Sequence, residues 1–179
     1  MTAKKKPSKA AIKQKQPQQQ PKAENNNHEE INRNMPAMVR HHSYIADLSF
    51  ETFDVSKRLM QGAGNMGVSY AFDVSARQVG DYFFTVALLI KTKAEAEPGD
   101  VAMLLEMRYE GLFEIRHDIK DEGEIKRLML VDAVEMMFPY TVNVISNVTR
   151  ESGFAPVAIE RIDFAKVFEE RERTAQTVN

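Results

Sequence analysis

An alternation with a period of two, apolar at odd positions and mostly charged at even ones, runs from Val101 to Ile115 and constrains the fold of this chain more than any other feature. In the stretch VAMLLEMRYEGLFEI the odd positions are apolar apart from one glycine, and four even positions are charged: Glu106, Arg108, Glu110 and Glu114. A helix returns its apolar residues every three or four positions, so this period of two predicts a long antiparallel strand with one face on a core and one in water. Leu104 interrupts the polar face, either as an incidental exposed leucine or as part of a contact patch.

Three further segments, residues 44–51, 68–75 and 82–90, alternate in a similar way and predict strands. The third of them is apolar on both faces, which is typical of a central strand or of one that offers an apolar face to a partner. Because short turns separate the last three strands, we expect four sequential antiparallel strands in a meander, apart from a long first connection at 53–65. Long connections in compact domains are usually functional or mobile.

The period changes to that of helices after the fourth strand. Apolar positions predict a helix over 123–137, which Pro139 is expected to break and restart, since proline suits the first turn of a helix. Gly153 is placed to cap the end of this second helix, and a short amphipathic helix is expected over 164–173.

A sheet followed in sequence by helices predicts an α+β fold: a four-stranded antiparallel sheet covered by helices on one face only. The other face of the sheet is expected to stay open. It should carry the residues on the polar sides of the first and fourth strands, namely Asp47, Glu51, Leu104 and Glu106.

The 179-residue chain divides by composition into a basic leader and an acidic body. Residues 1–40 are rich in Lys, Gln, Asn and Pro and carry nine Lys/Arg and three Glu, a net charge of +6, whereas residues 41–179 carry a net charge of −8. The leader holds too few apolar residues to offset the entropy of ordering it. We therefore predict a disordered leader at 1–40, one domain at 41–173 and a flexible tail at 174–179. The lysines of the leader are either solubilising or a contact for RNA, ribosome or acidic lipid.

Motifs that carry chemistry are scarce. The absence of cysteine excludes disulfides, zinc–thiolate sites and thiol nucleophiles. The sequence has no phosphate-binding loop, dinucleotide fingerprint, serine nucleophile elbow, secretory signal or apolar run of membrane-span length. We therefore expect a cytoplasmic binding protein without cofactor or catalysis, and we do not expect nucleic acid as its partner.

The remaining groups of titratable residues do not predict a catalytic or metal site either. His41 and His42 with Asp47 have the chemistry of metal ligands, but they border the predicted leader. His117 lies with Asp118 and Asp121 in a polar segment, which predicts a solvated turn. Along a strand, Glu106 and Glu110 lie about 13 Å apart, which is long for shared acid–base work.

Three segments resemble the SecB family of bacterial protein-export chaperones. They are YIADLSFE (Tyr44–Glu51), LLEMRYEGLFEI (Leu104–Ile115) and MFPYTVNVISNVTRESGFAPVAI (Met137–Ile159), and the likeness runs in collinear order from about Tyr44 to Arg173. The last segment is the most specific, with its FPY sequence, its helix with an arginine near the end and its Gly-Phe-x-Pro crossover. The resemblance implies a homotetramer, a dimer of dimers whose helices lie between two outward-facing sheets.

The resemblance also implies a function: an ATP-independent chaperone that binds unfolded precursor proteins, keeps them export-competent and delivers them to the SecA motor. In this family SecA docks on an acidic patch of the open sheet face, and the matching positions are Asp47, Glu51, Leu104 and Glu106. This reading favours a functional Leu104. The alternatives are a SecB-like chaperone dedicated to another client, such as an antitoxin, and a small-molecule-binding α+β domain.

The client contacts follow from a departure from the family. Better-known members often carry a tryptophan in the first connection, and this chain has none. Methionine packs adaptably on surfaces that bind varied partners, and two consecutive methionines on a helix cannot both face the sheet. The expected client contacts are therefore apolar residues of the first connection and the first helix: Phe53, Leu59, Met60, Met136 and Met137.

Overall fold

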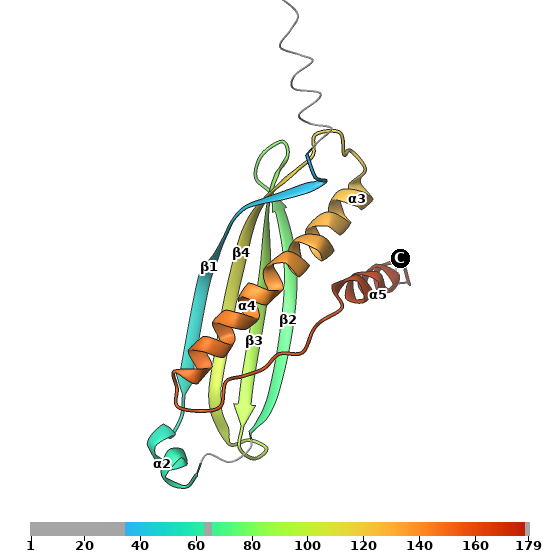
Figure 1. The fold of residues 1–179 in the computed structure, drawn as a ribbon. Helices are drawn as coiled ribbons and strands as arrows, with labels where there is room; N and C mark the ends of the chain where they lie inside the picture. Colours follow the sequence, from blue (N-terminus) through green and yellow to red (C-terminus); the bar gives the residue numbers. More distant parts are fainter. Residues whose placement is uncertain (1–34, 63–65, 178–179) are drawn as a thin grey trace, which may run out of the picture.

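The computed structural model describes residues 35–62 and 66–177, which form a four-stranded antiparallel sheet with one long helix lying across one face (Figure 1). The strands are β1 (Met38–Thr52), β2 (Gly67–Gln78), β3 (Phe83–Glu95) and β4 (Val101–Ile115). The predicted α+β architecture, with helices on one face of the sheet, is confirmed. Most of the leader predicted to be disordered lies outside the described residues.

The order of the strands differs from the predicted meander. The order is β1-β4-β3-β2, so only β2, β3 and β4 follow one another, and β1 pairs with β4 at the opposite edge from β2. The long first connection allows this arrangement, because it carries the short helix α2 (Val55–Met60) past the end of the sheet between the two edge strands (Figure 1). The strand that is apolar on both faces, β3, is central, as its composition predicts.

A bulge in β1 changes which of its residues face the helix. The register shifts between Ile45 and Asp47, so that Ile45 lies opposite Tyr109 whereas Tyr44 lies opposite Glu110. A bulge inserts one residue into the alternation and reverses the faces beyond it. Tyr44 therefore points to the open face whereas Leu48 points to the helix, so the alternation expected over residues 44–51 is not regular throughout.

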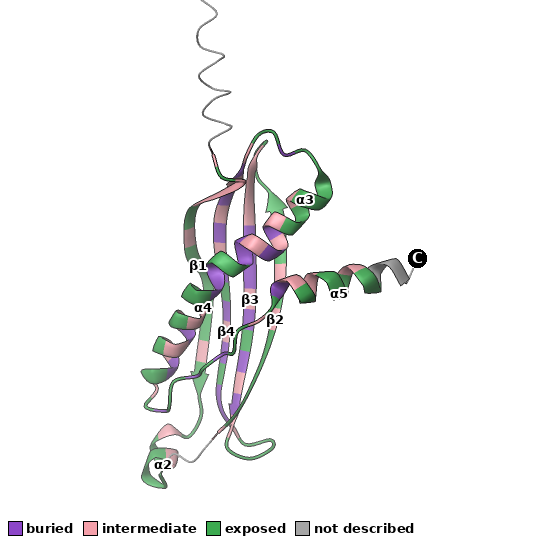
Figure 2. Ribbon diagram, turned by 45° about the vertical axis from the view of Figure 1, so that its right-hand side comes forward, coloured by how far each residue is buried: buried purple, intermediate pink, exposed green. Residues whose placement is uncertain are grey.

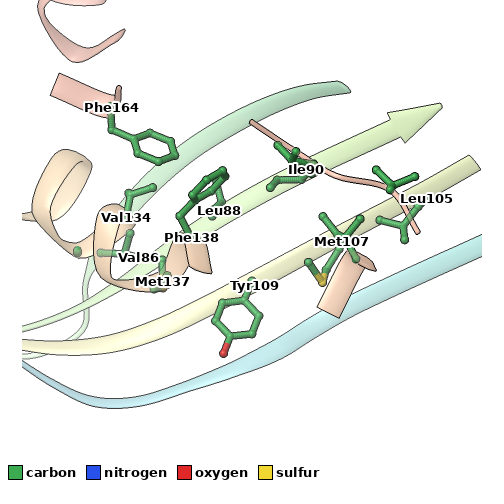
Figure 3. Close-up of a cluster of buried hydrophobic side chains, with 14 of the residues drawn as sticks. Val86, Leu88, Ile90, Leu105, Met107, Tyr109, Val134, Met137, Phe138 and Phe164 are labelled. Atoms are coloured by element: carbon green, nitrogen blue, oxygen red, sulfur yellow. The ribbon is translucent and has the colours of Figure 1, made fainter. Parts of the chain in front are cut away.

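The core fills the space between the sheet and the long helix. The odd residues of β4 and the even residues of β3 line it, and buried positions run along both strands (Figure 2). Figure 3 shows the side chains that meet there, with Phe138 of the helix beside Leu88 of β3. The largest side chains that are wholly buried include Phe113, Phe164, Leu88, Ile90, Met107 and Met137.

The helix is continuous where the sequence predicted a break. Helix α3 (Glu122–Arg127), a π-helical turn (Leu128–Asp132) and α4 (Ala133–Arg150) join into one helix of 29 residues. Pro139 lies on its exposed side, so the carbonyl of Glu135 that loses its helical partner faces water. The next carbonyl, that of Met136, accepts a hydrogen bond of 3.1 Å from Nη1 of Arg40 on β1.

The unbroken helix is long and apolar enough to cross a membrane by length and composition, which the sequence analysis missed by dividing it in two. Half of its most apolar window is buried within this fold. The core helix of a sheet protein passes the same test, and its apolar side here packs on β3 and β4.

The C-terminal part wraps back over the sheet. Gly153 takes the left-handed conformation predicted for a helix cap, with a φ of +83°, and α5 (Phe164–Thr177) follows an extended crossover (Figure 1). Phe164 anchors α5, because its buried ring packs edge-to-face on Phe72 and Phe138. Because α5 reaches Thr177 and β1 begins at Met38, the folded part exceeds the predicted bounds of 41 and 173 at both ends.

A close approach between β4 and α4 depends on Gly111. A Cβ added there would lie 2.5 Å from Cε2 of Phe113 and 2.7 Å from Sδ of Met137, and both of these side chains are wholly buried. We predict that Gly111→Ala lowers the free energy of unfolding by about 1–3 kcal/mol through overpacking. Chemical denaturation checks this, with Gly67→Ala as the control, since a Cβ there meets nothing closer than 3.8 Å. An unchanged unfolding midpoint for Gly111→Ala would show that the core yields freely at this point.

Candidate functional site

The open face of the sheet brings together the four residues predicted to form a contact patch. In the register of β1 and β4, Glu51 lies opposite Leu104 and Ser49 lies opposite Glu106. Asp47 lies one pair further along, opposite Arg108. All of these positions are on the side of the sheet that the long helix leaves uncovered, so the sequence pattern placed the four residues on the correct face.

A groove of about 550 Å³ crosses this face near the end of the sheet that carries α2. Each strand contributes to it, and its lining includes Ser49 and Glu51 from β1, Leu104 and Glu106 from β4, Lys91 and Lys93 from β3, and Ser69 and Ala71 from β2. We call this the open-face groove. It combines an exposed leucine with charges of both signs, so it suits an extended segment that carries charge and some apolar surface.

The lysines of β3 neutralise part of the groove. Nζ of Lys91 lies 2.9 Å from Glu106, and Nζ of Lys93 lies 3.0 Å from Glu95, although exposed pairs of this kind contribute only about 0–1 kcal/mol. Sequence reasoning missed both lysines because it ended the third strand at Ile90, where the apolar residues stop. The continued alternation of lysine with Thr92 and an alanine was the available signal.

Two carboxylates of this face have no partner among the described residues. Asp47 and Glu51 make no hydrogen bond or ion pair with any other residue in the described part of the chain, and both are exposed. Glu110, by contrast, is occupied: it accepts a hydrogen bond of 2.8 Å from the Tyr44 hydroxyl and one of 2.7 Å from Nε of Arg108. The free negative charge is therefore concentrated on β1, beside the groove.

The pKa values of the Tyr44–Glu110 pair fit this division. Partial burial raises the pKa of Glu110, but the hydrogen bonds from Arg108 and Tyr44 outweigh it and leave that pKa below its usual value. The same hydrogen bond to Glu110 raises the pKa of Tyr44. Glu110 is thus held ionised by its hydrogen-bond partners, and Glu106 pairs separately with Lys91. The two glutamates therefore do not form a pair of carboxylates that shares one proton.

The predicted client contacts of the first connection lie at one end of the sheet. Phe53, Leu59 and Met60 are exposed, with Met60 the most exposed at 88%. Leu59 reaches the turn that follows α4, because its Cδ1 lies 3.4 Å from where a Cβ of Gly153 would be. We call these three residues the α2 ledge.

Arg58 fixes the α2 ledge to the turn between β3 and β4. Its guanidinium donates to both carboxylate oxygens of Asp100, at 2.6 and 3.0 Å, and to the backbone carbonyls of Phe53 and Val101. A bidentate arginine–carboxylate pair is among the stronger hydrogen-bonded contacts available to an exposed helix. This contact stabilises α2, which has only six residues and buries none of its own side chains.

The two consecutive methionines of α4 point in different directions, as their spacing requires. Met136 is 42% exposed, next to the exposed Tyr140, whereas Met137 is wholly buried against the sheet at Gly111. Met137 is therefore corrected from a client contact to a core residue. Ile45 and Leu48 on the helix-facing side of β1 are also exposed, and Arg40 ties β1 to α4 beside them.

The histidines do not assemble the metal site considered from the sequence. Nε2 of His41 lies 2.8 Å from one oxygen of Glu114, and Nε2 of His117 lies 3.3 Å from the other. Among the described residues there is no group of three or more His, Asp or Glu side chains able to hold a metal. His117 also stacks on Tyr82 at 3.8 Å, so it is more constrained than a solvated turn residue.

Comparison with known proteins gives consistent matches. The family described as "Preprotein translocase subunit SecB" matches residues 31–175. The "Protein-export protein SecB" of Rhodospirillum rubrum is 32% identical over 134 residues, which cover 75% of this chain and 81% of the relative. That of Caulobacter vibrioides is 34% identical over 133 residues, which cover 74% and 80%.

A solved structure shares the fold. It is the SecB-like chaperone of Mycobacterium tuberculosis in complex with a peptide from an antitoxin, which matches with a TM-score of 0.58 at 12% sequence identity. The match covers 70% of this chain and 91% of that one. At this level of identity the likeness extends to the architecture and not to individual contacts.

The contact between Arg58 and Asp100 generates a prediction about the α2 ledge. Hydrogen bonds from Arg58 hold the pKa of Asp100 below its usual value. A carboxylate with a lowered pKa stabilises the fold above its ordinary pKa of about 4, and this contribution is lost as the pH falls through the lowered value. We predict that Asp100→Asn raises amide hydrogen exchange in 53–62 severalfold at neutral pH and removes the loss of protection in acid that we expect for the unaltered protein.

The matched control is Asp118→Asn, because Asp118 accepts a similar hydrogen bond of 2.6 Å from Arg116 away from α2. This control variant should leave exchange in α2 unchanged. Equal exchange in α2 for Asp100→Asn and the unaltered protein would show that Arg58 holds the helix through backbone carbonyls alone.

Proposed function

The chain belongs to the SecB family of protein-export chaperones, and from this membership and its open sheet face we propose that it delivers unfolded precursor proteins to SecA. It acts in the cytoplasm without ATP and without catalysis. The observation that carries the proposal is the convergence of Asp47, Glu51 and Leu104 with Glu106 on a sheet face that no helix of residues 35–62 and 66–177 covers.

The open face has the chemistry of a docking site for a basic segment with an apolar anchor. The unpaired Asp47 and Glu51 attract such a segment over a Debye length of about 8 Å at physiological salt. Leu104, which is 38% exposed, adds apolar burial next to them. The C-terminal zinc-binding tail that SecA presents in this family is a ligand of that kind.

Clients bind elsewhere, along the α2 ledge, whereas Met136, which was also expected to contact clients, belongs to the interface between protomers proposed below. At roughly 25 cal/mol per Å² of apolar area removed from water, a few such side chains supply useful affinity after the entropy of ordering the client is subtracted. Unfolded chains expose matching apolar side chains and folded ones do not. The sequence contains no phosphate-binding loop, in keeping with binding that does not depend on ATP.

We further propose that the chain assembles as a dimer of dimers. Four large apolar side chains are exposed on the adjoining sides of β1 and α4, namely Ile45, Leu48, Met136 and Tyr140. Clustered exposure of this kind marks an interaction surface rather than a monomer's free surface. The outer side of the long helix is then an interface between protomers, with the sheets facing outward.

A chaperone dedicated to one client is the second candidate, because the solved structure with the same fold holds an antitoxin peptide. SecA binding separates the two. A dedicated chaperone has no need of the unpaired acids of β1, whereas an export chaperone uses them.

Client holding is tested with Met60→Ser. Because Met60 is 88% exposed, its replacement should leave folding intact and weaken binding of a labelled unfolded precursor severalfold by fluorescence anisotropy, with the same result with or without ATP. Val79→Ser is the control, since Val79 is 45% exposed in the turn beyond β2, away from the ledge. Equal affinity of the protein for folded and unfolded precursor would contradict the proposal.

SecA docking is tested with Glu106→Lys and Leu104→Gln. The new lysine adjoins Lys91, so the charge of the groove changes from mixed to mainly positive. We expect the affinity for SecA to fall at least tenfold and the remaining binding to become less sensitive to salt. Both variants should still fold and hold clients, because an exposed strand substitution costs little stability.

Ser75→Lys is the control for charge alone, because it places a lysine on the same face about 20 Å from Ser69 along β2. It should bind SecA almost normally. The patch assignment is wrong if Glu106→Lys and Leu104→Gln both keep the affinity of the unaltered protein, and the two sites are reversed if they lose clients instead.

A further inference from the structure

The unpaired acids of β1 define what the open-face groove accepts. Asp47 and Glu51 lie on one side of one strand, four residues apart, so their Cα atoms are separated by about 13 Å. Neither has a partner in the described part of the chain. A segment with two cations at the same separation and a small residue between them, to pass over Ser49, fits this pair.

The chain carries such a segment in its own leader. Residues 9–13 read Lys-Ala-Ala-Ile-Lys, and Lys15 follows two positions later. In an extended segment Lys9 and Lys13 share one side at about 13 Å, with Ala11 between them. The leader as a whole is the basic counterpart of the acidic body.

We propose that residues 9–15 of the leader occupy the open-face groove and compete there with the basic tail of SecA. The competition rests on the proposed function, whereas the docking of the leader does not. The leader is thus a built-in occupant that a SecA molecule must displace.

The leader is long enough to reach the groove. From Met38 to Glu51, β1 spans about 40 Å, and the segment from Lys13 to Met35 reaches about 70 Å when extended. A ligand tethered in this way acts at an effective concentration on the order of millimolar, so weak electrostatic contacts suffice for substantial occupancy.

The groove also allows an incoming lysine to be exchanged for one already present. The pair of Lys91 and Glu106 is exposed on both sides, so its opening exposes no buried charge. A leader lysine that takes Glu106 leaves Lys91 in water. Because all of these contacts are exposed, about 1 M salt should remove them.

Disulfide trapping tests the docking without SecA, since the natural chain has no cysteine. The variant pair is Ala11→Cys with Ser49→Cys in the groove, because the docked segment passes Ala11 over Ser49, and the matched pair is Ala11→Cys with Ser75→Cys. Ser49 of β1 and Ser75 of β2 are both exposed on the open face, but Ser75 lies nearer the end of the sheet where β1 begins. Random collision therefore favours Ser75, and docking favours Ser49.

We expect the pair with Ser49→Cys to cross-link at least fivefold faster in low salt, and the preference to vanish in 1 M NaCl. Adding Asp47→Asn and Glu51→Gln should abolish it as well. Equal or faster cross-linking through Ser75→Cys in low salt overturns the proposal, because the leader then only collides with the face or binds elsewhere.

SecA titration separates this proposal from the proposed function. Lys9→Gln with Lys13→Gln should tighten binding of SecA to the full chain severalfold in low salt and leave it unchanged in 1 M NaCl. Unchanged affinity in low salt overturns the competition. If the trapping prefers Ser49 and SecA does not bind the unaltered protein at all, the docking of the leader stands and the proposed delivery to SecA fails.

Discussion

The packing of a single helix on one side of β4 and β3 determines every other surface of the molecule. Gly111 lets the helix approach so closely that Met137 and Phe113 fill the space a Cβ would need. Because one helix and an extended crossover cover only one side, no other element of the described residues covers the opposite side of the sheet (Figures 1 and 2). The open face is thus a consequence of how few elements the chain has for its core, and its polar residues are those that such a face tolerates.

The sequence identified the parts of this fold whose alternation is unbroken. β4 and the open-face positions of Glu51, Leu104 and Glu106 follow directly from a period of two. The sequence did not predict that β1 pairs with β4. Two strands with similar alternation can each take either edge of the sheet, and only the packing of the core distinguishes the two arrangements. The alternation over residues 44–51 gave the wrong face for Tyr44, because a bulge inserts one extra residue into an apparently regular pattern. Pro139 was read as a break because the sequence alone does not show that its ring points to water.

The sequence predicted the acidic residues of the candidate site but not its lysines. Lys91 and Lys93 alternate as regularly as the residues before them, but apolar content was taken as the limit of the strand. The two regions proposed to bind SecA and clients are neighbours, since Glu51 of the open face is followed two residues later by Phe53 of the α2 ledge. Arg58 and Asp100 reinforce this proximity by tying α2 to the turn that joins the two central strands. Client and motor are therefore expected at adjoining sides of one end of the sheet.

The bulge between Ile45 and Asp47 divides β1 into two parts whose faces are set separately. Ordinarily the loss or gain of one residue in a strand moves every side chain beyond it to the other face. Here the segment from Asp47 onward is held in register by β4, so the loss of the extra residue at Ala46 would re-orient only the part that leads back to Met38. That part contains a second register shift, between Arg40 and His42. An insertion between Met38 and Ile45 would therefore leave Asp47 and Glu51 in place beside the groove.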